Sequence, residues 1–176
     1  MDKNKSLNER MLKAARYNDF EGIKKMIDAG ADINYRDEDD DDAEVIAVVN
    51  HQVDILKYLI KKGAKITSLY GKKKKNILHI AIENDLEDQG FFEIINILVD
   101  AGADVNLKDK PGNTPFFYAC LCSVINTKTI ALLLKHGADM HSVNNYGASA
   151  FSVAKRDKDK ELLDVLEPYN SKRKPK

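Results

Sequence analysis

The sequence predicts an all-α solenoid of stacked helix-turn-helix units joined by β-turn or hairpin fingers. The first observation is a repeated tripeptide, Gly-Ala-Asp, at Gly30, Gly102 and Gly137, with Gly-Ala-Lys at Gly63. These glycines are 33, 39 and 35 residues apart, a period typical of stacked supersecondary units. The second is an alanine 16 to 21 residues before each glycine, and the third is a short apolar segment that ends at each glycine. The alanines are Ala14, Ala47, Ala81 and Ala119, and Ala154 begins a last unit that lacks the glycine.

Each unit has the pattern of two short helices. In the second unit, residues 44–50 (EVIAVVN) predict a first helix and residues 53–63 (VDILKYLIKKG) predict a second helix that glycine caps. The third and fourth units repeat the second helix as FFEIINILVDAG and KTIALLLKHG. Helices of about ten residues are marginal alone in water, so we expect stacking on neighbouring units to stabilise them cooperatively.

The segments between the helix pairs are polar. Residues 105–114 (VNLKDKPGNT) are rich in turn formers and fit a β-turn or a short hairpin before the next helix pair. We expect residues 1–5 and the basic tail, residues 169–176, to be disordered. The solenoid between them divides into units 6–36, 37–70, 71–108, 109–143 and 144–168.

A more specific signature occurs where the fourth unit begins. Residues 114–119 read Thr-Pro-Phe-Phe-Tyr-Ala, which resembles the Thr-Pro-Leu-His-x-Ala signature of ankyrin repeats. The third unit carries Asn-Ile-Leu-His-Ile-Ala at residues 76–81, and the last carries Ser-Ala-Phe-Ser-Val-Ala at residues 149–154. The lead-in Asp-x-x-Gly-x-Thr-Pro is intact at residues 109–115. The resemblance extends over residues 6–168 and implies about five ankyrin repeats, of which the first and last are atypical caps.

The chain departs from the ankyrin signature at identifiable positions. Glu44 stands where the family buries leucine, which predicts a distorted or rearranged structure at that position of the second unit. Phe117 replaces the signature histidine and exchanges bracing hydrogen bonds for apolar packing. His79 keeps that histidine, for which the resemblance implies hydrogen bonds to backbone that brace the finger. The turn at residues 83–89 is longer than its equivalents.

Composition and charge disfavour several classes of protein. Lys plus Arg and Asp plus Glu number 28 each, so no overall charge directs the chain to nucleic acid or to an anionic membrane. We expect no signal peptide and no membrane span, because no apolar stretch is long enough. Cys120 and Cys122 are too close for an ordinary disulfide, so we expect reduced thiols and a cytoplasmic location. Delivery to another cell stays open.

The sequence carries no motif of a catalytic or metal site. The histidines do not combine with a nucleophile at a recognisable spacing, and there is no Gly-rich phosphate loop. The acidic run at residues 37–42 (DEDDDD) lacks the alternating acids and central glycine of a calcium loop. We therefore expect no enzyme activity, no cofactor and no specific metal site.

The resemblance implies a protein-binding scaffold, whose partner meets the finger tips and the concave face of the first helices. We expect a protein partner and an unbound monomer. Tyr35 and Tyr70 are expected to be exposed beside the charged fingers, because tyrosine suits interfaces. The candidate contacts are Tyr35, Glu38, Asp39, Asp41, Val49, Asn50, Tyr70, Lys72, Lys73, Lys75, Lys110, Asn113, Tyr118, Leu121, Asn145 and Tyr146.

Two functions within this class stay open. One is a general adaptor that holds a protein. The other is a dedicated inhibitor, such as an immunity protein, whose acidic finger blocks a basic cleft of a toxin or nuclease. Direct binding of nucleic acid through residues 72–75 (KKKK) and the tail is a third alternative, which the lack of interleaved aromatic residues disfavours.

The acidic and basic runs occupy equivalent places. Asp42 and Asn76 both stand in the signature threonine place, 34 residues apart, so residues 38–41 align with residues 72–75. Both runs should therefore lie on neighbouring finger tips. They either neutralise each other, at about 0.4 kcal/mol for a pair roughly 10 Å apart in water, or form a two-signed strip that matches a partner of reverse pattern.

Overall fold

The computed structural model describes residues 3–85, 91–121 and 127–170, which form ten α-helices and one two-stranded hairpin. The first helices of successive pairs are α1 (Lys3–Arg16), α3 (Ala43–Val49), α5 (Ile77–Asn84), α7 (Pro115–Leu121) and α9 (Ala150–Asp157). The second helices are α2 (Phe20–Asp28), α4 (Val53–Lys61), α6 (Phe91–Asp100), α8 (Thr127–Lys135) and α10 (Lys160–Asn170). Strands β1 (Leu69–Tyr70) and β2 (Lys75–Asn76) pair antiparallel.

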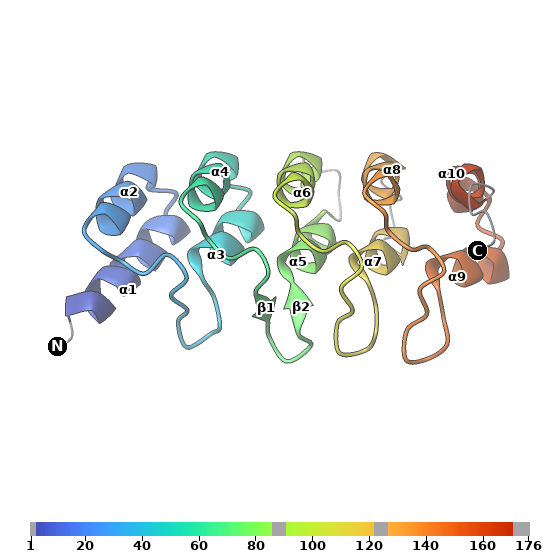
Figure 1. Cartoon of the computed structure of the whole chain (residues 1–176), viewed down its shortest axis with the longest axis horizontal. Coiled ribbons are helices and arrows are strands. Elements are labelled where there is room, and N and C mark those ends of the chain that lie inside the picture. Colours follow the sequence, from blue (N-terminus) through green and yellow to red (C-terminus); the bar gives the residue numbers. More distant parts are fainter. Residues whose placement is uncertain (1–2, 86–90, 122–126, 171–176) are drawn as a thin grey trace.

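The helix pairs stand side by side in one elongated row (Figure 1). The second helices form one layer, the first helices form a layer beside it, and the loops between successive pairs project beyond the first helices. We call these loops finger 1 (residues 29–42), finger 2 (62–76), finger 3 (101–114) and finger 4 (136–149). The arrangement confirms the predicted all-α solenoid of helix-turn-helix units.

The signature threonine place provides the N-cap of four first helices. The side-chain oxygen of the residue in this place accepts a hydrogen bond from the main-chain amide three residues further on, with donor–acceptor distances of 3.0–3.1 Å. This bond satisfies a helix amide that has no partner within the helix. The four capping residues are Asp42, Asn76, Thr114 and Ser149.

The repeated Gly-Ala pair ends the second helices α2, α4, α6 and α8. At α6, Gly102 has a φ of +91° and donates its amide to Val99 at 3.0 Å, while Ala103 donates to Leu98 at 2.9 Å. This closing pattern needs a left-handed residue, and glycine adopts that conformation without a steric cost. The predicted C-cap role of the glycines is confirmed at all four helices.

The core lies between the two helix layers and runs through successive units. Ala47, Ala81 and Ala119 are 5% exposed or less, so the repeated alanine marks close helix packing. Phe116 and Phe151, which replace the signature leucine, are buried as well. Because each unit buries part of its apolar surface on its neighbours, the array is stabilised as a whole.

Both ends of the solenoid extend beyond the predicted bounds. Helix α1 begins at Lys3, although the sequence predicts disorder through residue 5. Helix α10 continues through Pro168 to Asn170, although the predicted domain ends at residue 168. A tertiary contact holds this end, because Nε2 of His141 in finger 4 lies 3.1 Å from Oδ1 of Asn170. The rest of the predicted tail, most of the longer turn and Cys122 lie outside the described residues.

Candidate protein-binding surface

The fingers are short loops, and three of the four are held by a turn of the same kind. In this turn, a side-chain oxygen accepts hydrogen bonds from main-chain amides two or four positions further on. The accepting residue is Asp37 in finger 1, Asp109 in finger 3 and Asn144 in finger 4. Finger 2 has Gly71 in this place, which offers no side-chain acceptor, and it closes by pairing β1 with β2. The turns satisfy main-chain amides within the loop, so the tips have defined conformations.

The four tips share one backbone register. The left-handed position of the turn falls at Asp40, Lys74, Gly112 and Gly147, with φ of +68°, +54°, +87° and +74°. The acidic residues of finger 1 and the lysines of finger 2 are therefore structurally equivalent, as their 34-residue spacing predicts. The two tips also line one groove together.

Arg36 joins finger 1 to finger 2. Its guanidinium donates to Oδ1 of Asp40 at 2.9 Å and to the carbonyl oxygen of Leu69 at 2.8 Å. It also lies over the ring of Tyr70, 4.3 Å from the centroid, within the range of a cation–π contact. The amide of Gly71 donates to Oδ2 of Asp40 at 2.9 Å, and this bond and Arg36 hold the pKa of Asp40 below its usual value. These contacts fix how the two tips stand relative to each other.

Two carboxyl groups are buried beneath these tips. Asp42 accepts the hydroxyl of Tyr70 at 2.8 Å, and its Oδ2 lies 3.5 Å from Nε of Arg36. Glu44 is 2% exposed, and its Oε1 has no hydrogen-bond partner among the described residues. Burial, and then the charge of Asp42, raise the pKa of Glu44 to about 7. The prediction that the chain is distorted at Glu44 is wrong, because α3 runs regularly through this residue. The raised pKa lets the carboxyl group of Glu44 be buried with a proton.

The two charged runs do not neutralise each other through direct ion pairs. Among the described residues, no lysine of finger 2 lies within 4.0 Å of a carboxylate of finger 1. Asp37 pairs instead with Arg16 of α1, and Lys75 pairs with Glu83 of α5. The fingers are held by Arg36 and main-chain groups, so their positions do not depend on pairing of the two runs.

Fingers 2, 3 and 4 are joined more directly. The amide of Lys110 in finger 3 donates to the carbonyl oxygen of Lys73 in finger 2 at 2.7 Å. The amide of Asn145 in finger 4 donates to a carbonyl oxygen of finger 3 at 3.0 Å. The side chain of Asn144 donates to that of Asn113 at 2.8 Å, so the predicted contact residue Asn113 is engaged within the solenoid.

His79 braces finger 3 from α5. Its Nδ1 accepts the amide of Asn76 at 3.2 Å, and its Nε2 lies 3.1 Å from the carbonyl oxygen of Asn113. Because a carbonyl oxygen only accepts, Nε2 carries the proton and donates, and burial lowers the pKa of His79 and favours this neutral ring. The bracing role that the signature implies is confirmed. The equivalent residue of α7, Phe117, is 7% exposed, so its ring is covered by the core.

The predicted contact residues divide by their exposure. Glu38, Asp39, Val49, Asn50, Lys72, Lys73, Lys110, Leu121, Asn145 and Tyr146 are exposed. Tyr35, Asp41, Lys75, Asn113 and Tyr118 are half-buried. The expectation that Tyr70 is exposed is wrong, because Tyr70 is 6% exposed and its hydroxyl and ring are engaged by Asp42 and Arg36.

Two of the half-buried residues support the surface from below. Lys75, which pairs with Glu83, lies 4.9 Å from the centroid of the Tyr118 ring. The hydroxyl of Tyr118 donates to Asp109 at 2.8 Å, and burial and this bond raise the pKa of Tyr118 to about 12. Arg36, which the sequence prediction left out, has a comparable supporting role between fingers 1 and 2. A single arginine beside an acidic run does not reveal which neighbouring finger it contacts.

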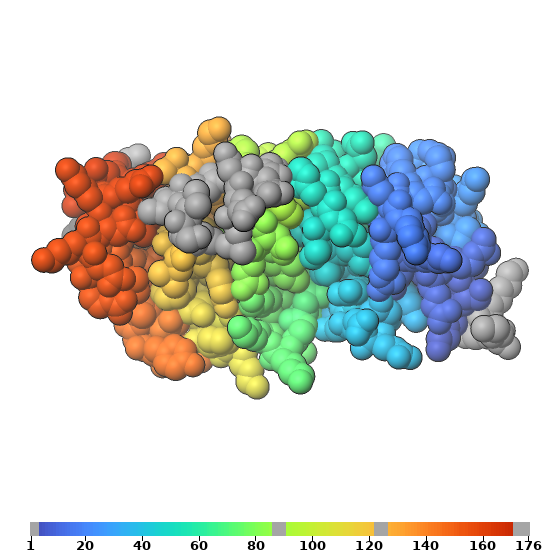
Figure 2. Space-filling view, turned by 180° about the vertical axis from the view of Figure 1, so that it is seen from behind, coloured from blue at the N-terminus to red at the C-terminus, as the bar shows by residue number. Residues whose placement is uncertain are grey.

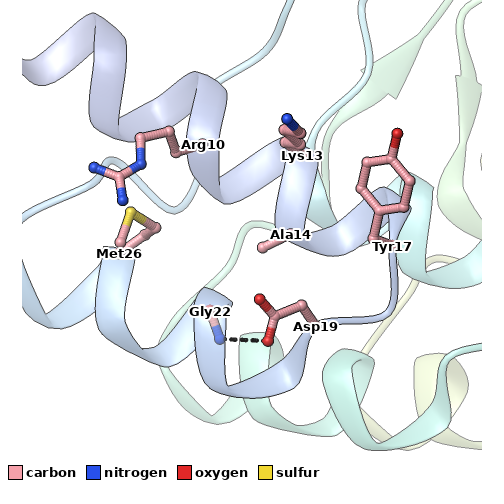
Figure 3. A pocket seen from close by; sticks show the side chains of 7 residues that line it. All are labelled: Arg10, Lys13, Ala14, Tyr17, Asp19, Gly22 and Met26. Atoms are coloured by element: carbon pink, nitrogen blue, oxygen red, sulfur yellow. Dashed lines mark hydrogen bonds between the residues drawn. The ribbon is translucent and has the colours of Figure 1, made fainter.

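A separate pocket of about 280 Å³ lies at α1 and α2 (Figure 3). In Figure 3, Arg10 and Tyr17 stand at opposite ends of the pocket. Asp19 accepts the amide of Gly22 at 2.8 Å and so serves as the N-cap of α2. The side chains that line it are those of Arg10, Lys13, Ala14, Tyr17, Asp19, Gly22 and Met26, and their polar groups do not converge on one point as in a catalytic site.

Residues 11–109 and 86–172 match the family model described as ankyrin repeats (3 copies). The chain belongs to the ankyrin-repeat family. Ankyrin repeats are generally non-enzymatic domains that mediate protein–protein binding. The ankyrin register agrees with the structure, since the signature threonine place caps the first helix and His79 braces the finger.

Curated relatives share the ankyrin repeats over a small part of their length. The palmitoyltransferase ZDHHC13 of Homo sapiens is 33% identical over 107 residues, which are 61% of this chain and 16% of that protein. The putative ankyrin repeat protein L371 of Acanthamoeba polyphaga mimivirus is 28% identical over 141 residues, 77% of this chain and 17% of that protein. The ankyrin repeat and SOCS box protein 6 of Pongo abelii is 33% identical over 113 residues, 61% of this chain and 25% of that protein. The ankyrin chain thus spans a quarter or less of these relatives.

Residues 3–85, 91–121 and 127–170 show no features of a metal site or of a membrane span. No three His, Cys, Asp or Glu side chains gather there as a metal site. None of the helices in these ranges has the length and apolar character to cross a membrane. Cys120 is a buried thiol on α7.

Proposed function

We propose that this ankyrin-repeat chain is a non-enzymatic interaction module that binds a partner protein through its finger tips and the concave face of its first helices. One observation carries the proposal, namely where large apolar side chains are exposed. Within the described part of the chain, these side chains lie in the fingers or at the C-terminal ends of first helices, and none lies on a second helix. They are Tyr17, Val49, Leu69, Leu121, Val143 and Tyr146.

The most exposed of these residues suit a protein interface. Tyr146 is 82% exposed at the tip of finger 4, and Leu121 is 50% exposed at the end of α7. Burying such side chains on a partner removes apolar area from water, and aromatic residues are enriched at interfaces. The finger tips project along one edge of the molecule (Figure 2). Within the described ranges, no large apolar side chain of a second helix is exposed to this extent.

Some charged side chains at the finger tips also lack ion pairs among the described residues. Asp39 and Lys72 are exposed, and neither has an ion pair within the described residues. Such charges contribute mainly to specificity and to the rate of association. We place the binding in the cytoplasm, where Cys120 would remain a reduced thiol, and we take the unbound module to be a monomer.

Affinity capture tests the proposed function. Tagged protein is used to isolate partners, and each partner is then purified and its affinity measured with variants. Leu121→Ser combined with Tyr146→Ala should lower the affinity more than about tenfold, because both side chains would lose buried contacts. Lys25→Ser combined with Lys61→Ser, on exposed positions of α2 and α4, is the matched control and should leave the affinity unchanged. Equal effects of the two variant pairs would contradict the proposed face.

A dedicated inhibitor is the second candidate function. Glu38 and Asp39 are exposed at the tip of finger 1 and have no ion pair in the described chain, so they are available to a basic cleft. Replacing Glu38, Asp39 and Asp41 by Ser should slow association while thermal stability stays nearly unchanged. The association rate of the unmodified protein should also fall as salt is added. A rate that responds to neither change rules out inhibition through the acidic finger.

A further inference from the structure

The junction between fingers 1 and 2 differs from the other finger junctions. Fingers 2 and 3, and fingers 3 and 4, exchange main-chain hydrogen bonds of 2.7 and 3.0 Å near their tips. The structure describes all residues of fingers 1 and 2, and these two fingers form no hydrogen bond between their main chains. They are joined through the side chains of Arg36 and Asp40. A groove of about 380 Å³ lies at this junction. In Figure 2, the cyan tip of finger 1 stands apart from the green tip of finger 2.

The groove has charges of opposite sign on its two fingers. Finger 1 contributes Asp39 and Asp41, and finger 2 contributes Lys72 and Lys73. Apolar surface between the fingers comes from Val45, Tyr70 and Ile80. A groove with apolar surface between opposite charges suits a segment that carries both an apolar side chain and charged ones.

The four charged side chains are not compensated within the described chain. None of them lies within 4.0 Å of an opposite charge. Asp40 and Lys75, the other charged residues that line the groove, are engaged by Arg36 and by Glu83. Burial and the neighbouring carboxylates raise the pKa of Asp41, so a cation brought against Asp41 would be stabilised.

The Arg36 contacts explain why these opposite charges stay apart. On freely moving loops, carboxylates and lysines would approach each other. Here Arg36 binds Asp40 in its own finger and the carbonyl oxygen of Leu69 in finger 2, and Asp40 in turn binds the amide of Gly71. The separation of the two tips is therefore set by these bonds, and the groove is formed before any partner arrives.

We propose that this groove binds an extended segment of the partner protein, in which a cationic side chain meets Asp39 and Asp41 and an anionic side chain meets Lys72 and Lys73. This inference rests on the proposed protein-binding function and names the chemistry of the bound segment. An apolar side chain between the two charges contacts Val45 and Ile80. A segment with charges of only one sign brings like charges together at one finger and binds less well.

Selection from a library of short random peptides, displayed on phage, tests the proposal with the full chain at physiological salt. Enriched peptides should carry a basic and an acidic residue separated by an apolar one. The affinity of a synthetic peptide of this kind is then measured by calorimetry. Asp39→Ser with Asp41→Ser, and Lys72→Ser with Lys73→Ser, should each lower that affinity about tenfold. Lys25→Ser with Lys61→Ser, at exposed positions of α2 and α4 away from the fingers, is the matched control and should have no effect.

Charge reversal gives a second readout. Lys72→Glu combined with Lys73→Glu makes the groove acidic on both fingers, so it should reject the two-signed peptide and bind the peptide whose acidic residue is changed to lysine. The proposal is overturned if the enriched peptides do not carry both a basic and an acidic residue. It is also overturned if the two double serine variants bind the synthetic peptide with unchanged affinity. If the selected peptides lose affinity only with Leu121→Ser and Tyr146→Ala, the groove is not the site while the proposed function stands. Thermal unfolding of every variant checks that the fold is retained.

Discussion

The hydroxyl group of Tyr70 in β1 donates a 2.8 Å hydrogen bond to Oδ2 of Asp42, the residue that caps α3. Both residues are buried, with exposed fractions of 6% and 2%. One buried bond therefore joins finger 2 to the start of α3. Arg36 packs over the same tyrosine ring, so the helix cap and the spacing of two fingers depend on one group of side chains.

Tyr70→Phe is expected to lower the free energy of unfolding by about 2 kcal/mol. The ring and its contact with Arg36 stay, but a buried carboxylate oxygen of Asp42 loses its hydroxyl donor. Urea denaturation monitored by circular dichroism measures the change. Tyr146→Phe removes the same hydroxyl from a side chain that is 82% exposed, and it should leave stability unchanged. Equal stabilities of the two variants would contradict a structural role for the buried bond.

Glu44 should make stability depend on pH. Its pKa rises from an ordinary value of 4.5 to about 7 in the fold, so the folded state binds the proton more tightly than the unfolded state. The stabilisation by this proton is fully present below about pH 4.5 and is lost as pH rises to about 7. Glu44→Gln should therefore be more stable than the unmodified chain above pH 7, by up to about 3 kcal/mol, and the difference should vanish near pH 4.5.

Urea denaturation at several pH values tests the role of Glu44. Glu38→Gln makes the same chemical change at an exposed position of finger 1 and serves as the control. Its effect on stability should be small at every pH. A stability difference for Glu44→Gln that stays constant from acid to alkaline pH would show that the buried carboxyl group does not titrate in this range.

Gly112→Ala should be more destabilising than Gly147→Ala. Both glycines occupy the left-handed position of a finger, with φ of +87° and +74°, so each alanine has a backbone cost of about 1–2 kcal/mol. At Gly112 the added Cβ would also lie 2.8 Å from the amide nitrogen of Asn145, whereas the space at Gly147 is open. That overlap should add about 1–3 kcal/mol to the loss of stability. Thermal or urea unfolding of the two variants measures the difference, and equal losses would contradict close packing of fingers 3 and 4.

Lys74→Gly should stabilise the chain by about 0.5 kcal/mol as the balance of two effects. Glycine adopts the φ of +54° at this position without strain, which stabilises the folded state. Glycine also makes the unfolded chain more flexible, which offsets part of this gain. Lys72→Gly, at an exposed position of the same tip, only makes the unfolded chain more flexible, so it should lower the free energy of unfolding by about 0.5–1 kcal/mol. Calorimetric melting of both variants measures the two effects. A lower melting temperature for Lys74→Gly would show that the left-handed backbone costs less than the flexibility of glycine.

Local sequence was sufficient to predict the repeat architecture and its register. Gly102 and its equivalents were recognisable because a helix end needs a left-handed residue, which glycine supplies without strain. Asn76 and Thr114 were placed in the signature threonine position, and the structure adds that their side chains cap the helix that follows. The equivalence of the acidic and basic tips followed from counting residues between these positions. In each case the deciding interaction joins residues close together in the chain.

The exposure of the candidate residues could not be predicted in the same way. Tyr70 occupies a finger position that resembles an exposed tyrosine in sequence, yet it is buried because Asp42 and Arg36 of finger 1 contact it. Glu44 breaks the ankyrin pattern, and the sequence could not show that burial beside a second carboxylate would raise its pKa instead of distorting the helix. The burial of Tyr70 depends on contacts between residues about 25 to 35 positions apart in the chain.

The sequence by itself determined that this protein is a solenoid of repeated helix pairs, that a glycine ends the second helix of four units, and that charged tips of opposite sign stand on neighbouring fingers. Only the tertiary structure decided that Arg36 and Tyr70 hold those fingers together, and that Asp39 and Lys72 stay unpaired at a shared groove. The physical reason is that helix caps and turns are local interactions. Burial, ion pairing and groove shape instead arise where one repeat packs on the next.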